Sequence, residues 1–455
     1  MSDRREGATP ATLQADPLAN RLSEVLDRRL DARNSAPIAV AFSGGGDSLA
    51  LLLLAKIWAD LRRRTLVAIT VDHRLQPQSA QWALWCRARA ERMGVRHQTV
   101  EWSGAKPSTG IQGSARIARH GLLADAARAM GAGVILMGHT ADDCLEAAVM
   151  RRAGSRNSAP REWAPSPGWP RGRGGYILRP LLAARRAELR TALTAAGQTW
   201  IEDPANSDPR SARAQARFTL AEGAFAAAGD GPRRPRQANC AALLESVRQG
   251  AAGELSIDIE AFTAATPDVR RAFLGAAVVC VSGSAAPPRS EALDRLLGRI
   301  GKRAPFTASL CGARIAFDGA RLQAMREAGE MRRAGDKTAA LQSNRAVVWD
   351  GRYEIRARVP NLVVRSMQGS VGKLPRADRA ALRNIAPAAR PTLFAIDDLA
   401  GQITCPILAW DDRVEARPLI MERFAGAAGA VANEAAIWRV AQARANAYMQ
   451  CAKAR

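Results

Sequence analysis

The chain has 455 residues, which is too long for one ordinary hydrophobic core and predicts two or three domains. Its 66 Lys and Arg outnumber 43 Asp and Glu, giving a formal net charge of +23, which predicts a polyanionic partner unless the excess is only solvated surface arginine. The seven cysteines include no C-x-x-C pair for zinc or an iron–sulfur cluster, and no apolar stretch reaches the roughly 20 residues that span a bilayer, so we expect a cytoplasmic protein without a membrane partner.

From Ile38 to about Ile201, short apolar runs alternate with amphipathic segments, a pattern that predicts parallel strands joined by right-handed helical crossovers. The expected fold class is therefore α/β, with an N-terminal doubly wound parallel sheet. Strands are expected at 38–42, 66–71, 98–102, 134–137 and 176–178. Helices are expected at 49–61, 80–93, 112–130, 142–152 and 185–196.

The run Ser43-Gly44-Gly45-Gly46-Asp47-Ser48 lies between the first expected strand and the first expected helix. Adjacent glycines let backbone N–H groups approach an oxyanion, and a helix N-terminus adds partial positive charge. The run lacks the ending of a Walker loop and the spacing of a dinucleotide fingerprint. It resembles the S-G-G-x-D-S loop of ATP pyrophosphatases, the PP-loop, which implies ATP binding by these six residues. A plain glycine turn is the alternative.

Two further positions are candidates for contact with a nucleotide. Asp72 follows the second expected strand and is suited to orient ATP or to hold Mg²⁺, although a strand-end aspartate equally often caps the next turn. Arg116 and Arg119 share one face of the helix expected at 112–130. Either would reach an ATP phosphate or RNA, or remain solvated.

The segment from Gly138 to Glu146 follows the fourth expected strand and opens a helix with three acids, Asp142, Asp143 and Glu146, next to His139. Residues three or four apart share a helix face, so the acids form a local negative patch. Acids in a first turn often only oppose the helix dipole. Three acids with a histidine exceed that need, and we expect a cation partner, either a metal or an ammonium group.

Residues 151–217 contain thirteen arginines against five acids, with Trp163 and Trp169 among them. Arginine beside exposed aromatic rings is suited to RNA, since phosphates are neutralised and unstacked bases find a flat partner. The prolines and glycines of 153–175 predict a long basic loop without regular structure. The expected tRNA contacts are Arg151, Arg152, Arg156, Arg171, Arg173 and Arg179. A tryptophan that fills a domain interface is the alternative for either ring.

Beyond the first domain, expected at 1–225, the stretch 229–237 is rich in Pro and Arg and predicts a linker. A mainly helical middle domain is expected at 238–330. A small mixed α/β C-terminal domain that contacts tRNA is expected at 345–455, with strands at 347–349, 353–359 and 362–364 and a final helix at 434–453.

Six motifs in one order over about residues 38–217 resemble those of the tRNA(Ile)-lysidine synthetase family, a bacterial group of PP-loop ATPases. They are SGGGDS at 43, VDHRL at 71, ARIARH at 115, GHTADDCLE at 138, LRPLL at 178 and DPANSD at 203. The family usually has Gln and Thr where Cys144 and Ala147 stand, often Tyr at His120, and a fuller Arg-Asn-x-x-Arg pattern at 213–217. The later half resembles the family only in VWDGR at 348.

The resemblance implies a reaction on isoleucine tRNA with a CAU anticodon. ATP adenylates O2 of the first anticodon cytidine, pyrophosphate leaves, and free L-lysine attacks C2 through its ε-amine and displaces AMP to give lysidine. The expected cofactors are ATP and Mg²⁺, with the metal at Asp47. Asp143 and Glu146 would bind lysine, and the expected catalytic residues are Asp47, His139, Asp143 and Glu146.

Three alternative functions follow from the same residues. A PP-loop enzyme that thiolates tRNA needs a thiolate or iron–sulfur carrier, and a glutamine-dependent amidotransferase needs a cysteine site for ammonia release. Neither has its expected cysteines here. An RNA-binding relative without catalysis is possible from the departures at Cys144 and Ala147, but Ser43, Asp47 and Glu146 favour an enzyme.

Overall fold

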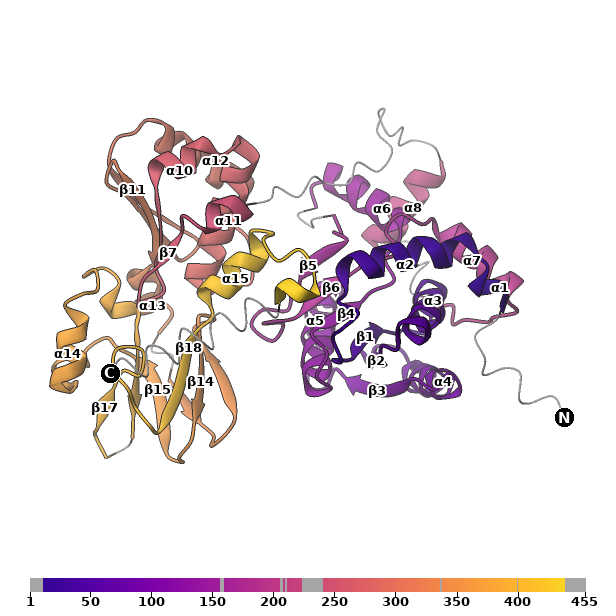
Figure 1. Ribbon diagram of the computed structural model, residues 1–455, viewed down its shortest axis with the longest axis horizontal. Coiled ribbons are helices and arrows are strands. Elements are labelled where there is room, and N and C mark those ends of the chain that lie inside the picture. The colour runs from indigo at the N-terminus through magenta and orange to yellow at the C-terminus, as the bar shows by residue number, and fades with distance from the viewer. Residues whose placement is uncertain are drawn as a thin grey trace. The chain divides into compact units, whose positions relative to one another are not determined.

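The computed structural model describes residues 11–155, 159–204, 208, 211–222, 240–335, 338–398 and 400–437. These residues form two compact units, one from residues up to 222 together with 432–437 and the other from 240–431. Each unit contains its own sheets (Figure 1). The second unit includes the described parts of both 238–330 and 345–431, and one apolar cluster in it contains Phe273 from the former and Phe394 from the latter.

The first unit is built on a six-stranded sheet in the order β3-β2-β1-β4-β6-β5. Its strands are β1 (Ile38–Ala41), β2 (Leu66–Asp72), β3 (Arg96–Glu101), β4 (Val134–Leu136), β5 (Trp163–Pro165) and β6 (Tyr176–Leu178). Neighbouring strands pair in parallel except β5 with β6. The five strands expected from the sequence are confirmed, and the α/β class with them.

Among the described residues, two helices precede β1, four fill the intervals from β1 to β5 as the periodicity predicts, and two follow β6. They are α1 (Ala11–Gln14), α2 (Pro17–Arg29), α3 (Gly46–Arg62), α4 (Ser79–Arg92), α5 (Ile111–Ala129), α6 (Ala141–Arg152), α7 (Arg186–Ala195) and α8 (Ala212–Ala221). Because parallel crossovers are right-handed, the strand order puts α3 and α4 on one face of the sheet and α5 on the other. Apolar side chains of α5, including Leu123, pack against Ile69 and Ile135 of the sheet.

The strand order reverses between β1 and β4, which lie side by side and pair through Ala39 with Ile135. In an open parallel sheet, such a switch point leaves a crevice beyond the carboxyl ends of the two strands. The run Ser43–Ser48 follows β1 and includes the first residues of α3, and the loop after β4 contains His139. The fold therefore brings these two predicted motifs to one edge of the sheet.

The expectation of no regular structure within 153–175 is wrong, because β5 pairs antiparallel with β6 at the sheet edge. Proline is tolerated there since an edge strand leaves backbone donors unpaired. Trp163 of β5 is buried at 3% exposure and stacks on Tyr176, with ring centroids 5.0 Å apart. The proposed contact of Trp163 with an RNA base is therefore also wrong, since the ring belongs to the core.

The second unit begins with a five-stranded antiparallel sheet in the order β7-β8-β11-β10-β9, which the sequence analysis did not predict among the helices expected in this region. The elements are β7 (Arg248–Gln249), β8 (Leu255–Asp258), β9 (Phe306–Leu310), β10 (Ala313–Phe317), β11 (Arg321–Arg326), α9 (Ala241–Leu244), α10 (Ile259–Ala264), α11 (Pro267–Ser282), α12 (Ser290–Gly301) and α13 (Ala328–Arg333). The turns Cys311-Gly312 and Asp318-Gly319 join the last three strands, and Gly312 and Gly319 have φ values of +82° and +102°. An Asp-Gly pair between alternating runs is a hairpin signal that periodicity for helices overlooks.

The rest of the second unit contains two smaller antiparallel sheets, ordered β12-β15-β16-β17 and β13-β14-β18. Their elements are β12 (Ala339–Leu341), β13 (Ala346–Trp349), β14 (Tyr353–Ala357), β15 (Leu362–Ser366), β16 (Phe394–Asp397), β17 (Ile403–Thr404), β18 (Val414–Pro418), α14 (Arg376–Leu382), α15 (Ile420–Ala427) and the short 3₁₀ turns Val371–Lys373 and Arg390–Thr392. The three strands expected here are confirmed as β13, β14 and β15. Beyond residue 437, the helix expected at 434–453 lies outside the described residues. Across the described ranges, the helices fall short of the length and apolarity that a membrane span requires.

Candidate active site

The glycine-rich run after β1 forms a tight turn into α3. Ser43 donates its backbone N–H to Ser48 Oγ at 3.2 Å, and the two hydroxyl oxygens are 3.1 Å apart. Gly44 has a φ of +83°, and a Cβ there would lie 2.4 Å from Ile201 Cδ1, so glycine alone fits this position. Helix α3 begins at Gly46 without a side-chain cap from the residues described. Its first N–H groups are therefore suited to an anion.

The start of α3 approaches the end of β4 at Gly138. A Cβ at Gly138 would lie only 2.9 Å from the backbone oxygen of Asp47, so this close approach depends on glycine. Trp200 lies near the turn, since a Cβ at Gly46 would be in ordinary van der Waals contact with its Cδ1, at 3.5 Å. The turn is thus enclosed by packing, and His139 follows directly on the segment that meets it.

Arg186, the first residue of α7, contacts four carboxylates. Its backbone N–H donates to Asp142 Oδ2 at 2.7 Å, and its Nε donates to Asp47 Oδ2 at 3.1 Å. Its Nη1 donates to Glu146 Oε1 at 3.2 Å, and its Nη2 lies 3.8 Å from Asp143 Oδ2. Burial opposes charge on this guanidinium, but the carboxylates outweigh burial and raise the pKa of Arg186 above its usual value. One cation therefore joins the PP-loop to the acids of α6.

Two arginines of α8 complete the charge balance around Glu146, whose side chain is 1% exposed. Arg217 Nε donates to Glu146 Oε1 at 2.6 Å, and Arg213 Nε lies 3.9 Å from Oε2. Arg213 Nη2 also lies 3.6 Å from Asp143 Oδ1. The sequence predicts a metal or an ammonium partner for these acids. In the structure, the cations beside them are guanidinium groups from α7 and α8.

Asp143 also caps its own helix. Its Oδ2 accepts the backbone N–H of Thr140 at 2.8 Å and the Thr140 hydroxyl at 3.1 Å. Asp142 is 2.9 Å from Arg185 Nη2. Asp143 therefore has the capping role that the sequence offered as an alternative. The two hydrogen bonds from Thr140 fix the orientation of the carboxylate, and Oδ1 of Asp143 faces Arg213.

His139 is buried at 9% exposure, and Arg179 Nε donates to its Nδ1 at 3.0 Å. Since Nδ1 accepts, this hydrogen bond assigns the proton of the neutral ring to Nε2. Burial first, and the Arg179 charge second, lower the pKa of His139 well below its usual value. Burial likewise lowers the pKa of Arg179 to about 10. Arg179, expected to contact tRNA, is 6% exposed and instead orients His139.

Asp72 lies at the end of β2 and is buried at 5% exposure. Its Oδ1 accepts the backbone N–H of Arg74 at 2.7 Å, and Arg74 has a φ of +51°. This is the turn-capping contact that the sequence offered as the alternative to nucleotide binding. Contact of Asp72 with ATP stays a prediction.

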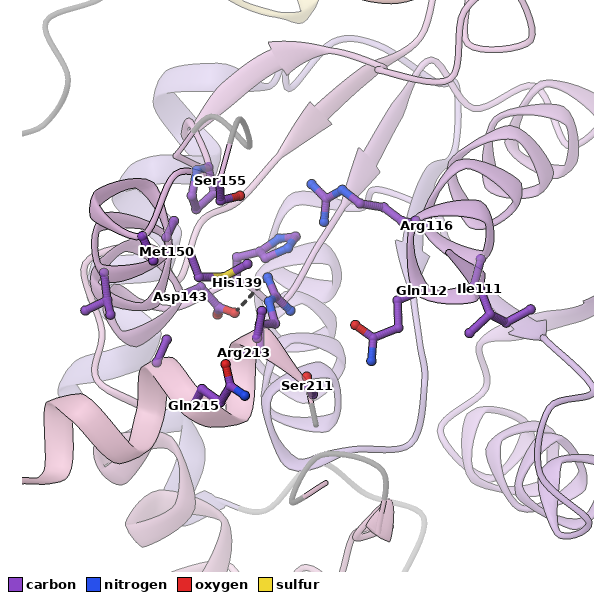
Figure 2. A pocket seen from close by; sticks show the side chains of 18 of the residues that line it. Ile111, Gln112, Arg116, His139, Asp143, Met150, Ser155, Ser211, Arg213 and Gln215 are labelled. Atoms are coloured by element: carbon purple, nitrogen blue, oxygen red, sulfur yellow. Dashed lines mark ion pairs between the residues drawn. The ribbon is translucent and has the colours of Figure 1, made fainter. Parts of the chain in front are cut away.

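A pocket of about 980 Å³ lies between α5, α6 and α8. Figure 2 shows Arg116 and Gln112 on one side, His139 and Asp143 opposite them, and Arg213 joined to Asp143 by an ion pair. The pocket therefore brings together three predicted site residues, Arg116, His139 and Asp143. Ser43–Ser48, Asp72 and Glu146 are not among its lining residues.

The two departures from the family motif lie on α6. Ala147 lines the pocket, where a smaller side chain leaves more room than Thr. Cys144 is half-buried, and burial raises the pKa of its thiol to about 11. The thiol is therefore neutral near pH 7.

The arginines expected to contact tRNA differ in their surroundings. Arg151 and Arg152 are exposed at the end of α6. Arg171 is exposed and pairs with Asp125 at 2.6 Å. Arg173 is half-buried, and Arg156 lies outside the described residues.

Asp47 is the carboxylate that best fits Mg²⁺ beside the PP-loop. The described residues contain no group of three or more His, Cys, Asp or Glu side chains that would hold a metal by themselves. Mg²⁺ commonly takes one or two carboxylates and completes its shell with phosphate oxygens and water, so a single aspartate next to a triphosphate fits. Burial raises the pKa of Asp47, and Arg186 opposes that shift.

The residue that the motif analysis overlooked is Arg186. A signal was available in the sequence, since Arg186 lies four residues after the Leu-Arg-Pro-Leu-Leu motif and in the first turn of the helix expected at 185–196. Arg213 and Arg217 entered only as part of an incomplete motif. Spacing along the chain does not reveal that α7 and α8 return to α6, because that approach is a tertiary contact.

A parallel α/β sheet with a PP-loop at its switch point and a charged cluster beside it defines a PP-loop ATPase. The family model described as "PP-loop domain" matches residues 16–223. The tRNA(Ile)-lysidine synthase of Caulobacter vibrioides is 44% identical over 91% of this chain and 99% of its own length. The chain belongs to the tRNA(Ile)-lysidine synthase family.

Other relatives carry the same name at greater distance. The tRNA(Ile)-lysidine synthase of Rhizobium meliloti is 37% identical over 72% of this chain and 74% of its own length, and that of Hyphomonas neptunium is 36% identical over 65% and 81%. Among solved structures, the U34-tRNA thiolase NcsA from Methanococcus maripaludis aligns with a TM-score of 0.38 and 16% identity over 45% of this chain and 73% of its own. That likeness is too weak to indicate a shared activity.

Proposed function

We propose that this chain ligates free L-lysine to C2 of the first anticodon cytidine of isoleucine tRNA with a CAU anticodon, with ATP as the activating substrate. The products are lysidine, AMP and pyrophosphate. The observation that carries the proposal is the connection of the PP-loop to the acids of α6 through Arg186, because the reaction needs an ATP site next to a site for an amine. Action on tRNA implies a cytoplasmic enzyme.

The first step transfers the adenylyl group of ATP to O2 of the cytidine and releases pyrophosphate. Ser43 and Ser48 present hydroxyl groups, and the start of α3 presents N–H groups, to the charge that develops on the leaving pyrophosphate. Asp47 would hold Mg²⁺, which neutralises phosphate charge when bound. Asp72 and Arg116 are the further residues proposed to contact ATP.

The second step is attack by the lysine ε-amine on C2. An ammonium group with a pKa of about 10.4 is almost fully protonated near neutral pH and must lose a proton first. Asp143 and Glu146 are the proposed acceptors, and both are already arranged to hold cations, here the guanidinium groups of Arg186 and Arg213. Lysine would replace a guanidinium contact in this cluster. The neutral ring of His139 would then orient a substrate through Nε2.

A lysidine assay with omission controls tests this function. The chain is mixed with ATP, Mg²⁺, labelled L-lysine and isoleucine tRNA that has a CAU anticodon, and label in the tRNA is measured together with pyrophosphate. We expect lysine to enter the tRNA only when every component is present. With every component present, continued pyrophosphate release without lysine transfer would contradict the proposal, and so would transfer to a tRNA whose first anticodon base is uridine.

A further inference from the structure

Two helices that line the pocket continue outwards into exposed apolar side chains. On α8, Phe218 is 64% exposed and follows the lining residues Ser211 and Gln215 by seven and three positions. On α5, Ile117 is 73% exposed and follows the lining residue Gly113 by four positions. Residues three or four apart are neighbours on a helix surface, so Phe218 lies beside one lining residue of α8 and Ile117 beside one lining residue of α5.

The rim has a third apolar side chain and a strongly basic setting. Leu75 lines the pocket itself and is 44% exposed. Arg116 and Arg119 line the same pocket, and Nε of Arg119 has no hydrogen-bond partner among the described residues. A cationic pocket with an exposed aromatic ring beside it matches the chemistry of single-stranded nucleic acid, in which phosphates and the flat faces of bases are both available.

We propose that Phe218 is a stacking platform for the unpaired base next to the target cytidine in the anticodon loop. The inference rests on the proposed function, since it takes the anticodon loop as the RNA. Inserting a cytidine into a pocket removes it from its stack with its neighbour. An exposed ring at the rim offers the neighbouring base a new stacking partner and so offsets that loss.

The test uses the full chain and an anticodon stem-loop in which the adenine after the target cytidine is replaced by 2-aminopurine, whose fluorescence is quenched on stacking. Wild type is expected to quench the fluorescence on binding. Phe218→Ala is expected to raise the Kd about 5- to 150-fold and to abolish quenching, because stacking on one aromatic ring accounts for that range. Phe218→Trp is expected to retain both, and the KM for ATP is expected to stay at the wild-type value in both variants.

Leu84→Ala is the matched control, since Leu84 is 66% exposed on α4 and does not line the pocket. The proposal is overturned if Phe218→Ala binds and quenches like wild type, or if the substitution changes only the sedimentation of the free protein, which would assign the ring to contact with a second copy. Failure of wild type itself to form lysidine would overturn the proposed function instead. The two outcomes are therefore distinguishable.

Discussion

Arg186 Nε lies 3.1 Å from Asp47 Oδ2, while Nη1 of the same guanidinium lies 3.2 Å from Glu146 Oε1. The planar fork of an arginine allows one side chain to serve two acids in a fixed geometry. A residue of α7 thereby sets the separation between the carboxylate of the PP-loop and the carboxylate proposed to receive lysine. In the proposed mechanism, both steps would depend on that separation.

Replacing Arg186 is expected to affect stability and both substrates. Arg186→Met leaves Asp47 and Glu146 without this cation and should lower the free energy of unfolding by about 3–5 kcal/mol, the range for a broken buried ion pair. The kcat/KM values for ATP and for lysine should both fall. Urea unfolding and steady-state kinetics measure these effects. Arg190→Met is the control, since Arg190 is half-exposed and pairs with Glu202. If kcat/KM fell for lysine but stayed at the wild-type value for ATP, the proposed role of Arg186 toward both substrates would be contradicted.

Glu146→Gln is expected to separate the two steps. The amide keeps the shape of the side chain but cannot accept the lysine proton, so lysidine formation should fall about 10²- to 10⁴-fold. ATP binding should be unchanged within the error of the Kd. Rapid-quench measurement of lysine transfer tests the expected loss of lysidine formation, and equilibrium binding of ATP tests the expected unchanged Kd. Unchanged turnover at saturating lysine would contradict a role for Glu146 in the reaction. Glu202→Gln is the control for the loss of one negative charge, since Glu202 is exposed.

His120 is expected to make the stability of the protein sensitive to acid. The ring is 4% exposed, and neither nitrogen has a hydrogen-bond partner among the described residues. Burial first, and nearby arginines second, lower the pKa of His120 to about 2 in the folded state. Below about pH 6.5, His120 is therefore protonated in the unfolded chain and neutral in the folded chain. The free energy of unfolding then falls by up to about 1.4 kcal/mol for each pH unit below that value.

His120→Phe should flatten this part of the pH profile, because it removes the titrating group while keeping an apolar ring. Urea midpoints at several pH values between 4 and 7 give the two slopes. Equal slopes for wild type and variant would show that His120 does not titrate differently on unfolding. His97 is the comparison for a histidine that has a hydrogen-bond partner, since its Nε2 is hydrogen-bonded to the Thr70 hydroxyl with the two atoms 2.8 Å apart.

Much of the first unit could be predicted from the sequence, because its strands and helices follow local periodicity. The strands β1, β4 and β6 are continuous apolar runs, and β2 is apolar except for Thr70 and the terminal Asp72, a pattern typical of a buried parallel sheet. The motifs of the site were predicted from the sequence, but the ion pairs that join them were not. Glu146 was recognised as an acid on α6, but its partners come from residues 40 and 71 positions away. Contacts of that separation depend on how the helices pack, which no local pattern encodes. Trp163 was misjudged for the same reason.

Binding to tRNA is expected to depend steeply on salt through Arg151 and Arg152. Each phosphate contact releases counterions, so each substitution by Ala should weaken binding to all tRNAs and reduce the slope of log K against log salt by about 0.7–0.9. Filter binding at several salt concentrations measures that slope. Arg171→Ala should change the slope less, because Asp125 already pairs with that side chain. If the affinity of wild type for tRNA did not change with salt concentration, the proposed contact of this basic surface with tRNA would be contradicted.

The buried pair of Arg64 and Glu434 is expected to be essential for the stability of the first unit. Arg64 Nη2 and Glu434 Oε1 are 3.0 Å apart with side chains 2% and 4% exposed, and Glu434 also accepts from Asn34 and from the backbone of Asp31. Glu434→Gln should cost about 3–5 kcal/mol, since it leaves a buried cation uncompensated. Glu188→Gln, in an exposed pair, should cost less than about 1 kcal/mol. Similar urea midpoints for the two variants would contradict this assignment.

The most direct measurement is mass spectrometry of the nucleosides from isoleucine tRNA after incubation with the chain, ATP, Mg²⁺ and isotopically labelled lysine. The account predicts that the first anticodon cytidine alone is converted to labelled lysidine and that one AMP is formed for each conversion. An unmodified cytidine in tRNA that the chain binds, with ATP bound at the same time, would contradict it.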